Sequence, residues 1–230
     1  MGELICVDLG LAEYGATFDL QQQLVKRVRA SEEGLAYLLL VEHDPPVVTL
    51  GRSAREEHVI GTAEDLAREG IEVHQVNRGG DVTYHGRGQL VGYPILRLDA
   101  PRRGVRQYLR GLEEVLIRLL GRFGIEGRRT EGLTGVWVGD EKIAAIGVAV
   151  RQWVTYHGFA LNVAANLKHF ELIVACGLSD RGVTDMSGVV GRPVTVAEVK
   201  EPLIECVMEV FGFDGARQEE AGELRHGLDQ

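Results

Sequence analysis

The feature of this sequence that most constrains its fold is a series of strand-like segments between residues 135 and 163. The stretch GVWVGDEKIAAIGVAV holds two apolar segments joined by a short turn at Gly139, Asp140 and Glu141, which is the pattern of a β-hairpin. WVTYHGFALNV follows, and its alternating apolar and polar residues predict a further strand of the same sheet. Strands joined by short turns run antiparallel, so we expect a mostly antiparallel sheet.

Helical and strand-like segments alternate along the rest of the chain. Apolar residues at helical spacing predict helices over 12–30 and 105–123, and a shorter helix is expected near 63–68. Thr195 and Glu198 form a capping-box pattern before a helix that ends near Phe211. Further strands are expected at 4–9, 35–43, 47–52, 71–76 and 89–98.

These elements predict a single α+β domain over residues 1–213, built on a mixed, mostly antiparallel sheet flanked by helices. A chain of 230 residues with 45% hydrophobic content can bury a sizeable core without disulfides. Residues 214–230 are polar and rich in glutamate, so we expect a disordered tail there.

Charge and cysteine content argue against several classes of function. The net charge of -9 argues against nucleic acid as a partner. Cys6, Cys176 and Cys206 are scattered and form no Cys-x-x-Cys pair, so neither a disulfide framework nor a metal site is indicated. No signal-peptide pattern and no run of about 18 apolar residues is present. We therefore expect a cytoplasmic protein that neither spans a membrane nor holds a metal.

The stretch RGGDVTYHGRGQLVG, residues 78–92, combines five glycines with a histidine, a tyrosine and three charged side chains. Its glycine spacing matches neither the dinucleotide-binding fingerprint nor the phosphate-binding loop. A plain turn between two strands would explain two of these glycines. The larger number favours a backbone that closely approaches an elongated ligand.

Cys176 is a candidate nucleophile because it ends an apolar segment and precedes a glycine, where backbone N–H groups can face an incoming carbonyl. The alternative is a small buried hydrophobic residue, as we expect for Cys206. A nucleophilic thiolate needs a nearby base or cation, since an ordinary thiol has a pKa of about 8.5. His85 and His157, each between a tyrosine and a glycine, are candidates for this role, and each could instead be structural.

Lys142 is a second candidate partner for the thiol. Four of the 25 basic residues are lysines, so the chain uses arginine for most of its positive charges. A lysine kept here suggests a need for an amine that can lose its proton when desolvated. The alternative is a solvated residue beside the turn at Asp140 and Glu141.

Four motifs in a fixed order resemble the lipoyl(octanoyl) transferases, the octanoyltransferases of lipoate biosynthesis: NRGGDVTYHGRGQLVGYPI, GVWVGDEKIAAIG, WVTYHGFALNV and ACG. The resemblance covers residues 42–186. It implies the fold of lipoate and biotin protein ligase catalytic domains. It also implies an acyltransferase that moves an octanoyl group from octanoyl-acyl carrier protein to a lysine of lipoyl domains, namely those of 2-oxoacid dehydrogenase complexes and the glycine cleavage H protein.

The same resemblance implies roles for individual residues and no cofactor. Cys176 falls on the acyl-accepting cysteine and Lys142 on the lysine paired with it. The segments that line the acyl site correspond to Arg78, Gly79, Gly80, Asp81, Val82, Thr83, Tyr84, His85, Ala145, Ile146, Gly147, Gly158, Phe159 and Ala160. A basic patch of Arg102, Arg103, Arg106 and Arg110 would suit an acidic carrier, or is a solvated helix face balanced by nearby glutamates.

Three positions depart from the family pattern, because Arg87, Thr134 and Ala175 stand where the family commonly has proline. These changes affect loop rigidity and leave the preferred acyl chain length open. Three other functions also stay open: an ATP-dependent lipoate ligase, which needs no cysteine, a non-catalytic lipoyl or fatty-acyl binding module, and a Cys–His hydrolase.

Overall fold

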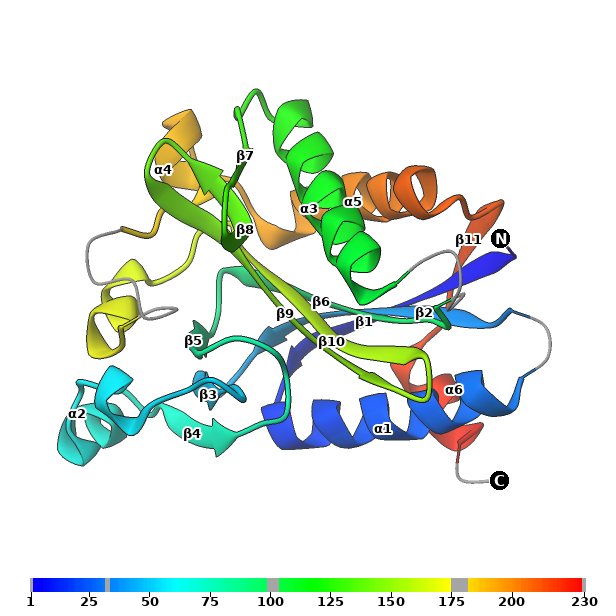
Figure 1. Ribbon diagram of the computed structural model, residues 1–230, viewed down its shortest axis with the longest axis horizontal. Coiled ribbons are helices and arrows are strands. Elements are labelled where there is room, and N and C mark those ends of the chain that lie inside the picture. Colours follow the sequence, from blue (N-terminus) through cyan, green and yellow to red (C-terminus); the bar gives the residue numbers. More distant parts are fainter. Residues whose placement is uncertain (1, 32–33, 99–103, 175–181, 229–230) are drawn as a thin grey trace.

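The computed structural model describes residues 2–31, 34–98, 104–174 and 182–228 (Figure 1). In chain order the elements are β1 (Glu3–Ala12), α1 (Tyr14–Ala30), β2 (Ala36–His43), β3 (Val47–Leu50), the 3-10 turn η1 (Glu56–His58), α2 (Ala63–Arg68), β4 (Glu72–Gln75), β5 (Val82–His85), β6 (Gln89–Ile95), α3 (Val105–Arg122), β7 (Arg128–Thr130), β8 (Leu133–Val138), β9 (Glu141–Arg151), β10 (Val154–Asn162), the 3-10 turn η2 (Leu167–Leu172), α4 (Met186–Val190), α5 (Val196–Phe211), β11 (Gly215–Gln218) and α6 (Ala221–His226).

Eight strands form one large sheet in the order β11-β1-β2-β6-β10-β9-β8-β7. β1 pairs in parallel with β11 and β2, and the remaining neighbours pair antiparallel. The predicted hairpin is β8 and β9, and β10 continues it as expected. The prediction of a mixed, mostly antiparallel sheet is therefore confirmed.

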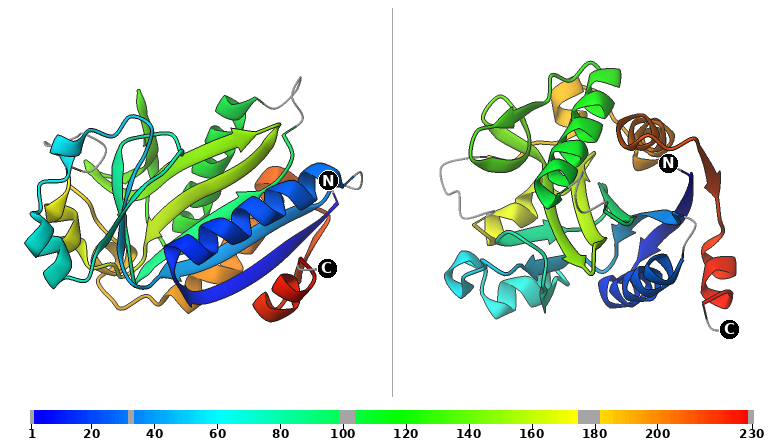
Figure 2. Two further views of the ribbon diagram at one scale, coloured as in Figure 1. Left: turned by 90° about the horizontal axis from the view of Figure 1, so that it is seen from below. Right: turned by 45° about the vertical axis from the view of Figure 1, so that its right-hand side comes forward.

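Helices cover both faces of the large sheet, with α3 and α5 on one side and α1 with α6 on the other (Figures 1 and 2). β2 shows why, since Leu38 and Leu40 enter the core under α3 and α5 while Leu39 and Val41 enter the core over α1. Alternate residues of a strand face opposite sides, so a continuous apolar strand can be buried between two helical layers. The capping box that begins α5 is present as predicted.

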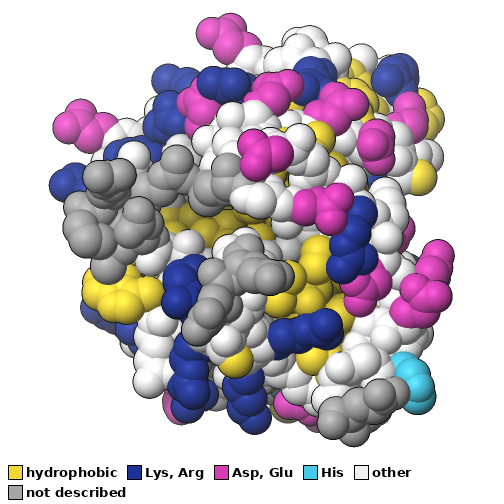
Figure 3. Space-filling model, turned by 90° about the vertical axis from the view of Figure 1, so that its right-hand side faces the viewer, with side chains coloured by type: hydrophobic (Ala, Val, Ile, Leu, Met, Phe, Trp, Pro, Cys, Tyr) yellow, Lys and Arg dark blue, Asp and Glu magenta, His cyan; other side chains and the backbone are white. Residues whose placement is uncertain are grey.

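Ion pairs link α3 with α5 on the outside of the molecule. Arg122 pairs with Glu205 and with Glu209, and Arg118 joins Glu114 to Glu209. The upper part of Figure 3, over these two helices, accordingly alternates basic and acidic side chains. None of the helices in the described part of the chain combines the length and apolar character needed to cross a bilayer.

A second, smaller sheet of three strands, in the order β4-β3-β5, lies at one end of the large sheet (Figure 1). Its own core joins Val48 and Tyr84 to Leu66 of α2 and Phe170 of η2. β5 lies inside the glycine-rich stretch, where the sequence predicted a ligand-binding loop and no strand. The strand forms because Val82–His85 pairs antiparallel with β3.

The prediction of a disordered tail is wrong for most of residues 214–230. Gly215–Gln218 forms β11, which pairs in parallel with the outer edge of β1, and α6 follows. Leu224 of α6 is fully buried in the core over α1. The composition of the tail could not indicate this, because the partner edge is offered by residues at the other end of the sequence.

Leu224→Ala tests whether this end of the chain belongs to the core. Removing a fully buried leucine side chain is expected to lower the free energy of unfolding by about 2–4 kcal/mol. Leu11→Ala is the matched control, because Leu11 is 51% exposed and should change stability by less than about 0.5 kcal/mol. Equilibrium urea unfolding measures both, and equal small effects would mean that the tail contributes nothing.

Candidate active site

A cavity of about 50 Å³ lies where the small sheet meets the face of the large one. Its walls come from β5 and the loop before it, from the middle of β6, β9 and β10, and from the first residue of α1. The lining residues are Tyr14, Arg78, Gly79, Gly80, Asp81, Val82, Thr83, His85, Val91, Tyr93, Ala145, Ile146, Gly147, His157, Gly158, Phe159 and Ala160.

Strand register brings two of the predicted wall segments together. In the antiparallel pairing of β9 with β10, Gly147 lies opposite Gly158, Ile146 opposite Phe159 and Ala145 opposite Ala160. The wall therefore has neighbouring backbone without side chains at its centre. The predicted wall residues all line the cavity except Tyr84.

Tyr84 lies on the far side of the small sheet. Its hydroxyl contacts His169 Nδ1 at 2.7 Å, and its ring packs edge-on against Phe170 at 5.3 Å between centroids. The assignment of Tyr84 to the cavity wall was wrong, because β5 alternates and its neighbours Thr83 and His85 take the cavity side.

The glycines of residues 78–92 serve two purposes. Gly79 and Gly80 line the cavity, as expected of a backbone that approaches a ligand. A Cβ atom at Gly88 would lie 2.0 Å from the carbonyl oxygen of Ala164, and one at Gly92 would lie 2.2 Å from the Phe159 ring. These later glycines are needed for packing against the protein itself, which corrects the prediction for that half of the stretch.

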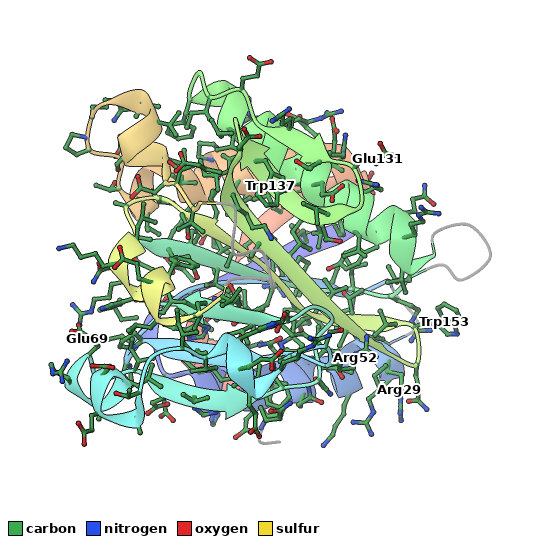
Figure 4. The ribbon with its side chains drawn as sticks, turned by 60° about the vertical axis from the view of Figure 1, so that its left-hand side comes forward. Arg29, Arg52, Glu69, Glu131, Trp137 and Trp153 are labelled. Carbon is green, nitrogen blue, oxygen red and sulfur yellow. The ribbon has the colours of Figure 1, made fainter. Side chains whose placement is uncertain are left out.

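Lys142 is buried in a small hollow that adjoins the cavity. The hollow is lined by Thr83, Gln89, Lys142, Ala145, Ala160, Asn162, Phe170 and Val183, and it shares Thr83, Ala145 and Ala160 with the cavity. The side chain of Lys142 is buried and not solvated, so the alternative of a solvated residue beside the turn is wrong. Its Nζ lies 4.8 Å from the ring centroid of Trp137 on β8, which Figure 4 labels. An aromatic face at this distance attracts an ammonium group.

Cys176 lies outside the described residues, as does Ala175, but both flanks of that segment are fixed. Before it, the Val174 amide donates to the His58 carbonyl oxygen at 2.7 Å. After it, the Lys142 amide donates to the Gly182 carbonyl oxygen at 3.0 Å. Gly182, the first described residue after Cys176, therefore lies against the backbone of Lys142.

The histidines around the cavity are held neutral. Burial lowers the pKa of His43 to about 4 and that of His157 to about 3. Burial, with His43 nearby, also holds the pKa of His85 well below its usual value. The Nε2 atom of His157 lies 3.1 Å from Asn77 Oδ1, and that of His85 faces Thr49 Oγ1 at 3.4 Å. Neither histidine is suited to supply the positive charge that a thiolate needs.

Several residues that line or support the cavity gave no signal in the sequence. The hydroxyl of Tyr93 is 2.7 Å from His43 Nε2. Thr49 accepts from Arg78 Nη2 at its hydroxyl oxygen, at 2.8 Å, and at its carbonyl oxygen, at 2.6 Å. Tyr14 contributes a wall from α1. Each of these residues lies within an ordinary strand or helix pattern of the sequence. Only contacts between segments that are distant in the sequence bring them to the cavity.

Comparison with known proteins yields concordant similarities. The family model of the lipoyl protein ligase A/B catalytic domain matches residues 13–208 of this chain. The octanoyltransferase of Alkaliphilus metalliredigens is 47% identical over 210 residues, covering 90% of this chain and 95% of that one. The octanoyltransferase of Chloroflexus aggregans is 47% identical over 214 residues, covering 92% and 96%. The bipartite lipoate protein ligase of Thermoplasma acidophilum has a TM-score of 0.76 at 19% identity, covering 99% of this chain and 89% of that one. This last likeness confirms the fold class.

Gly147→Ala tests the close packing behind the cavity. The added Cβ would lie 2.8 Å from the Gly79 carbonyl oxygen and 3.0 Å from Arg78 Cδ, so the loop must shift, at a cost of about 1–3 kcal/mol in the free energy of unfolding. Gly121→Ala in α3 is the control, since its Cβ meets nothing within 4 Å and should stabilise by about 0.5–1 kcal/mol. Urea unfolding measures both variants. A change in the free energy of unfolding with the same sign in both would contradict this account.

The neutral histidines predict a stability that falls with acid. Their pKa values are lower in the folded state than in the unfolded chain, so between about pH 6.5 and pH 4 the unfolded chain binds more protons and is favoured. His157→Asn removes one such group, and asparagine tolerates the positive φ of 55° at this position. From pH 7 to pH 5 the variant should lose about 2 kcal/mol less than the wild type. Denaturation curves at pH 7 and pH 5 measure this difference. An equal loss of stability in the variant and the wild type would refute the prediction.

Proposed function

This chain belongs to the lipoyl protein ligase A/B catalytic domain family and is an octanoyltransferase, and we propose that it acts through an octanoyl thioester on Cys176 with Lys142 as the proton carrier. The resemblance inferred from the four motifs is confirmed. The octanoyl donor is acyl carrier protein, and the acceptor is a lysine of a lipoyl domain. The acyl chain lies in the cavity between β5, β9 and β10.

The observation that carries the proposal is the position of Lys142. It is 7% exposed and adjoins an apolar-walled cavity through Thr83, Ala145 and Ala160. Its backbone also pairs with Gly182, which follows Cys176 by six residues in the sequence. A thiol needs a proton acceptor to become a nucleophile, and a buried amine at the edge of the acyl cavity can serve as one.

In the first half-reaction the Lys142 amine accepts the proton of the Cys176 thiol. The thiolate attacks the thioester carbonyl carbon, and the bond from that carbon to the carrier sulfur breaks. The carrier thiolate leaves and takes the proton from the Lys142 ammonium. The products are the octanoyl-enzyme thioester and the free carrier thiol.

In the second half-reaction the lysine amine of the lipoyl domain attacks the octanoyl-enzyme carbonyl. The carbon–sulfur bond to Cys176 breaks, and Lys142 passes the proton lost by the attacking amine to the departing sulfur. An amide is more stable than a thioester, so neither ATP nor a cofactor is required. Arginine cannot replace Lys142 in either step, because a guanidinium stays protonated.

The partners follow from the two half-reactions. The enzyme takes an acyl donor and a lipoyl-domain acceptor, and we propose that the acceptors include 2-oxoacid dehydrogenase complexes and the glycine cleavage H protein, all in the cytoplasm. In the proposed docking patch for the acidic carrier, Arg106 and Arg110 are exposed, and Arg110 also pairs with Glu113 at 2.7 Å. Arg102 and Arg103 lie outside the described residues.

The test is to mix the protein with octanoyl-acyl carrier protein, without ATP, and to measure intact masses. Wild type should gain one octanoyl group that hydroxylamine removes, and Cys176→Ala should gain none. Lys142→Arg should form the adduct more slowly by at least about tenfold, because the charge is kept and proton transfer is lost.

Cys206→Ala is the matched control. Cys206 is fully buried in α5, and burial raises the pKa of its thiol, so this variant should be acylated like the wild type. Octanoylation of a lipoyl domain by Cys176→Ala in the presence of ATP would instead identify an ATP-dependent ligase. Formation of the adduct by Lys142→Arg at the wild-type rate would exclude Lys142 as the base.

A further inference from the structure

A chain of buried side-chain hydrogen bonds runs through the protein beside the cavity. His85 Nδ1 lies 2.8 Å from Gln89 Oε1, Gln89 Nε2 donates to Asn162 Oδ1 at 2.9 Å, and Asn162 Nδ2 donates to the Thr184 carbonyl oxygen at 3.0 Å. Gln89 is 1% exposed and Asn162 4% exposed. Burying amide side chains costs folding free energy unless their donors and acceptors are all hydrogen-bonded.

The direction of each hydrogen bond is fixed by its neighbours. A carbonyl oxygen only accepts, so Asn162 must donate to Thr184 through its amide nitrogen and accept from Gln89 through its oxygen. Gln89 also donates to the Tyr84 carbonyl oxygen, so its own oxygen accepts from His85 Nδ1. The lone pair on His85 Nε2 then faces Thr49 Oγ1, which accepts from Arg78. The dipoles are aligned from the Arg78 guanidinium to Thr184 and strengthen one another.

The chain of bonds ends beside Lys142. The Thr184 amide donates to the Lys142 carbonyl oxygen at 3.1 Å, and the Lys142 amide donates to the Gly182 carbonyl oxygen at 3.0 Å. Gln89 and Asn162 also line the hollow that holds Lys142. Asn162 therefore fastens residues 182–184 to β10 while the same residues pair with β9 at Lys142.

We propose that Gln89 and Asn162 are positioning residues that hold the backbone flanking Lys142 in place and line the hollow around its side chain with neutral amides. An apolar pair could fill the same volume, but it could not fix the Thr184 carbonyl. A carboxylate has no hydrogen to donate to the Thr184 carbonyl oxygen. Its negative charge would also favour the protonated form of Lys142. This inference rests on the proposed role of Lys142 in proton transfer.

Other titratable side chains belong to the elements around Lys142. Glu141 lies on β9, Asp185 follows Thr184, His85 lies on β5 and His169 on η2. Glu113 of α3 is buried and accepts from the amide of Gly135, which lies beside the Lys142 side chain. All five are kept in the variants below, so a difference between variants reports the substituted amide.

Asn162→Asp is the first test, because it replaces a donor toward Thr184 with an anion at nearly constant shape. Gln89→Glu is the second variant and covers the case in which the first does not fold. In each, the pH profile of octanoyl transfer should move to higher pH by about one unit or more, which is a shift of at least about tenfold in rate at a fixed pH below the optimum. The KM for the carrier should change by less than about threefold, because Gln89 and Asn162 are buried and cannot contact the carrier.

Thr155→Val is the matched control. Thr155 is fully buried on the same strand, β10, and its hydroxyl donates to the Pro94 carbonyl oxygen at 2.8 Å at the far end of that strand. The control should lower stability and leave the pH profile unchanged. If the pH profile of octanoyl transfer is also unchanged in Asn162→Asp and Gln89→Glu, the two amides have only a structural role and the proposal is overturned.

A second readout separates this inference from the proposed function. The rate at which acetic anhydride acetylates Lys142, followed by mass spectrometry of its peptide over a pH series, does not depend on octanoyl transfer. A labelling profile that moves to higher pH in Asn162→Asp supports the positioning role even if Cys176 forms no adduct. An unmoved profile in both amide variants overturns it even if the adduct forms.

Discussion

The antiparallel pairing of β9 with β10 is the constraint on which the cavity depends. It sets Gly147 opposite Gly158 and Ala145 opposite Ala160, so the sheet itself supplies a wall of bare backbone and methyl groups. The same pairing leaves Lys142 at the start of β9, at the end of that wall. A slip of one residue would turn each of these positions to the other face of the sheet. Fold and site are therefore specified by one register.

Local sequence patterns predicted the parts of the structure that depend on local contacts. The turn at Gly139 to Glu141, the capping box of Thr195 and Glu198, and the apolar face of α3 each lie within a few residues of their partners. The wall segments of the site were found through their motifs, since each is a contiguous stretch. Lys142 was singled out by its type in a chain rich in arginine.

The features that the sequence did not indicate depend on contacts between distant segments. Gln89 and Asn162 are 73 residues apart, and neither is unusual within its strand until the two meet. β5 was hidden among glycines because its partner β3 decides its conformation. The sequence does not show whether the space beside a glycine is filled by a ligand or by the protein itself. For this reason Gly88 and Gly92 were wrongly assigned to ligand binding.

The parallel pairing of β11 with β1 has a consequence for how the chain acquires its structure during synthesis. Among the described strands β1 is made before the others, and its outer edge stays unpaired until residues 215–218 have followed it out of the ribosome. The contact spans nearly the whole sequence, which makes it slow to form. An exposed strand edge is a site where nascent chains can pair with one another. Completing the large sheet is thus a late event, and until then the edge of β1 is open to pairing with another nascent chain.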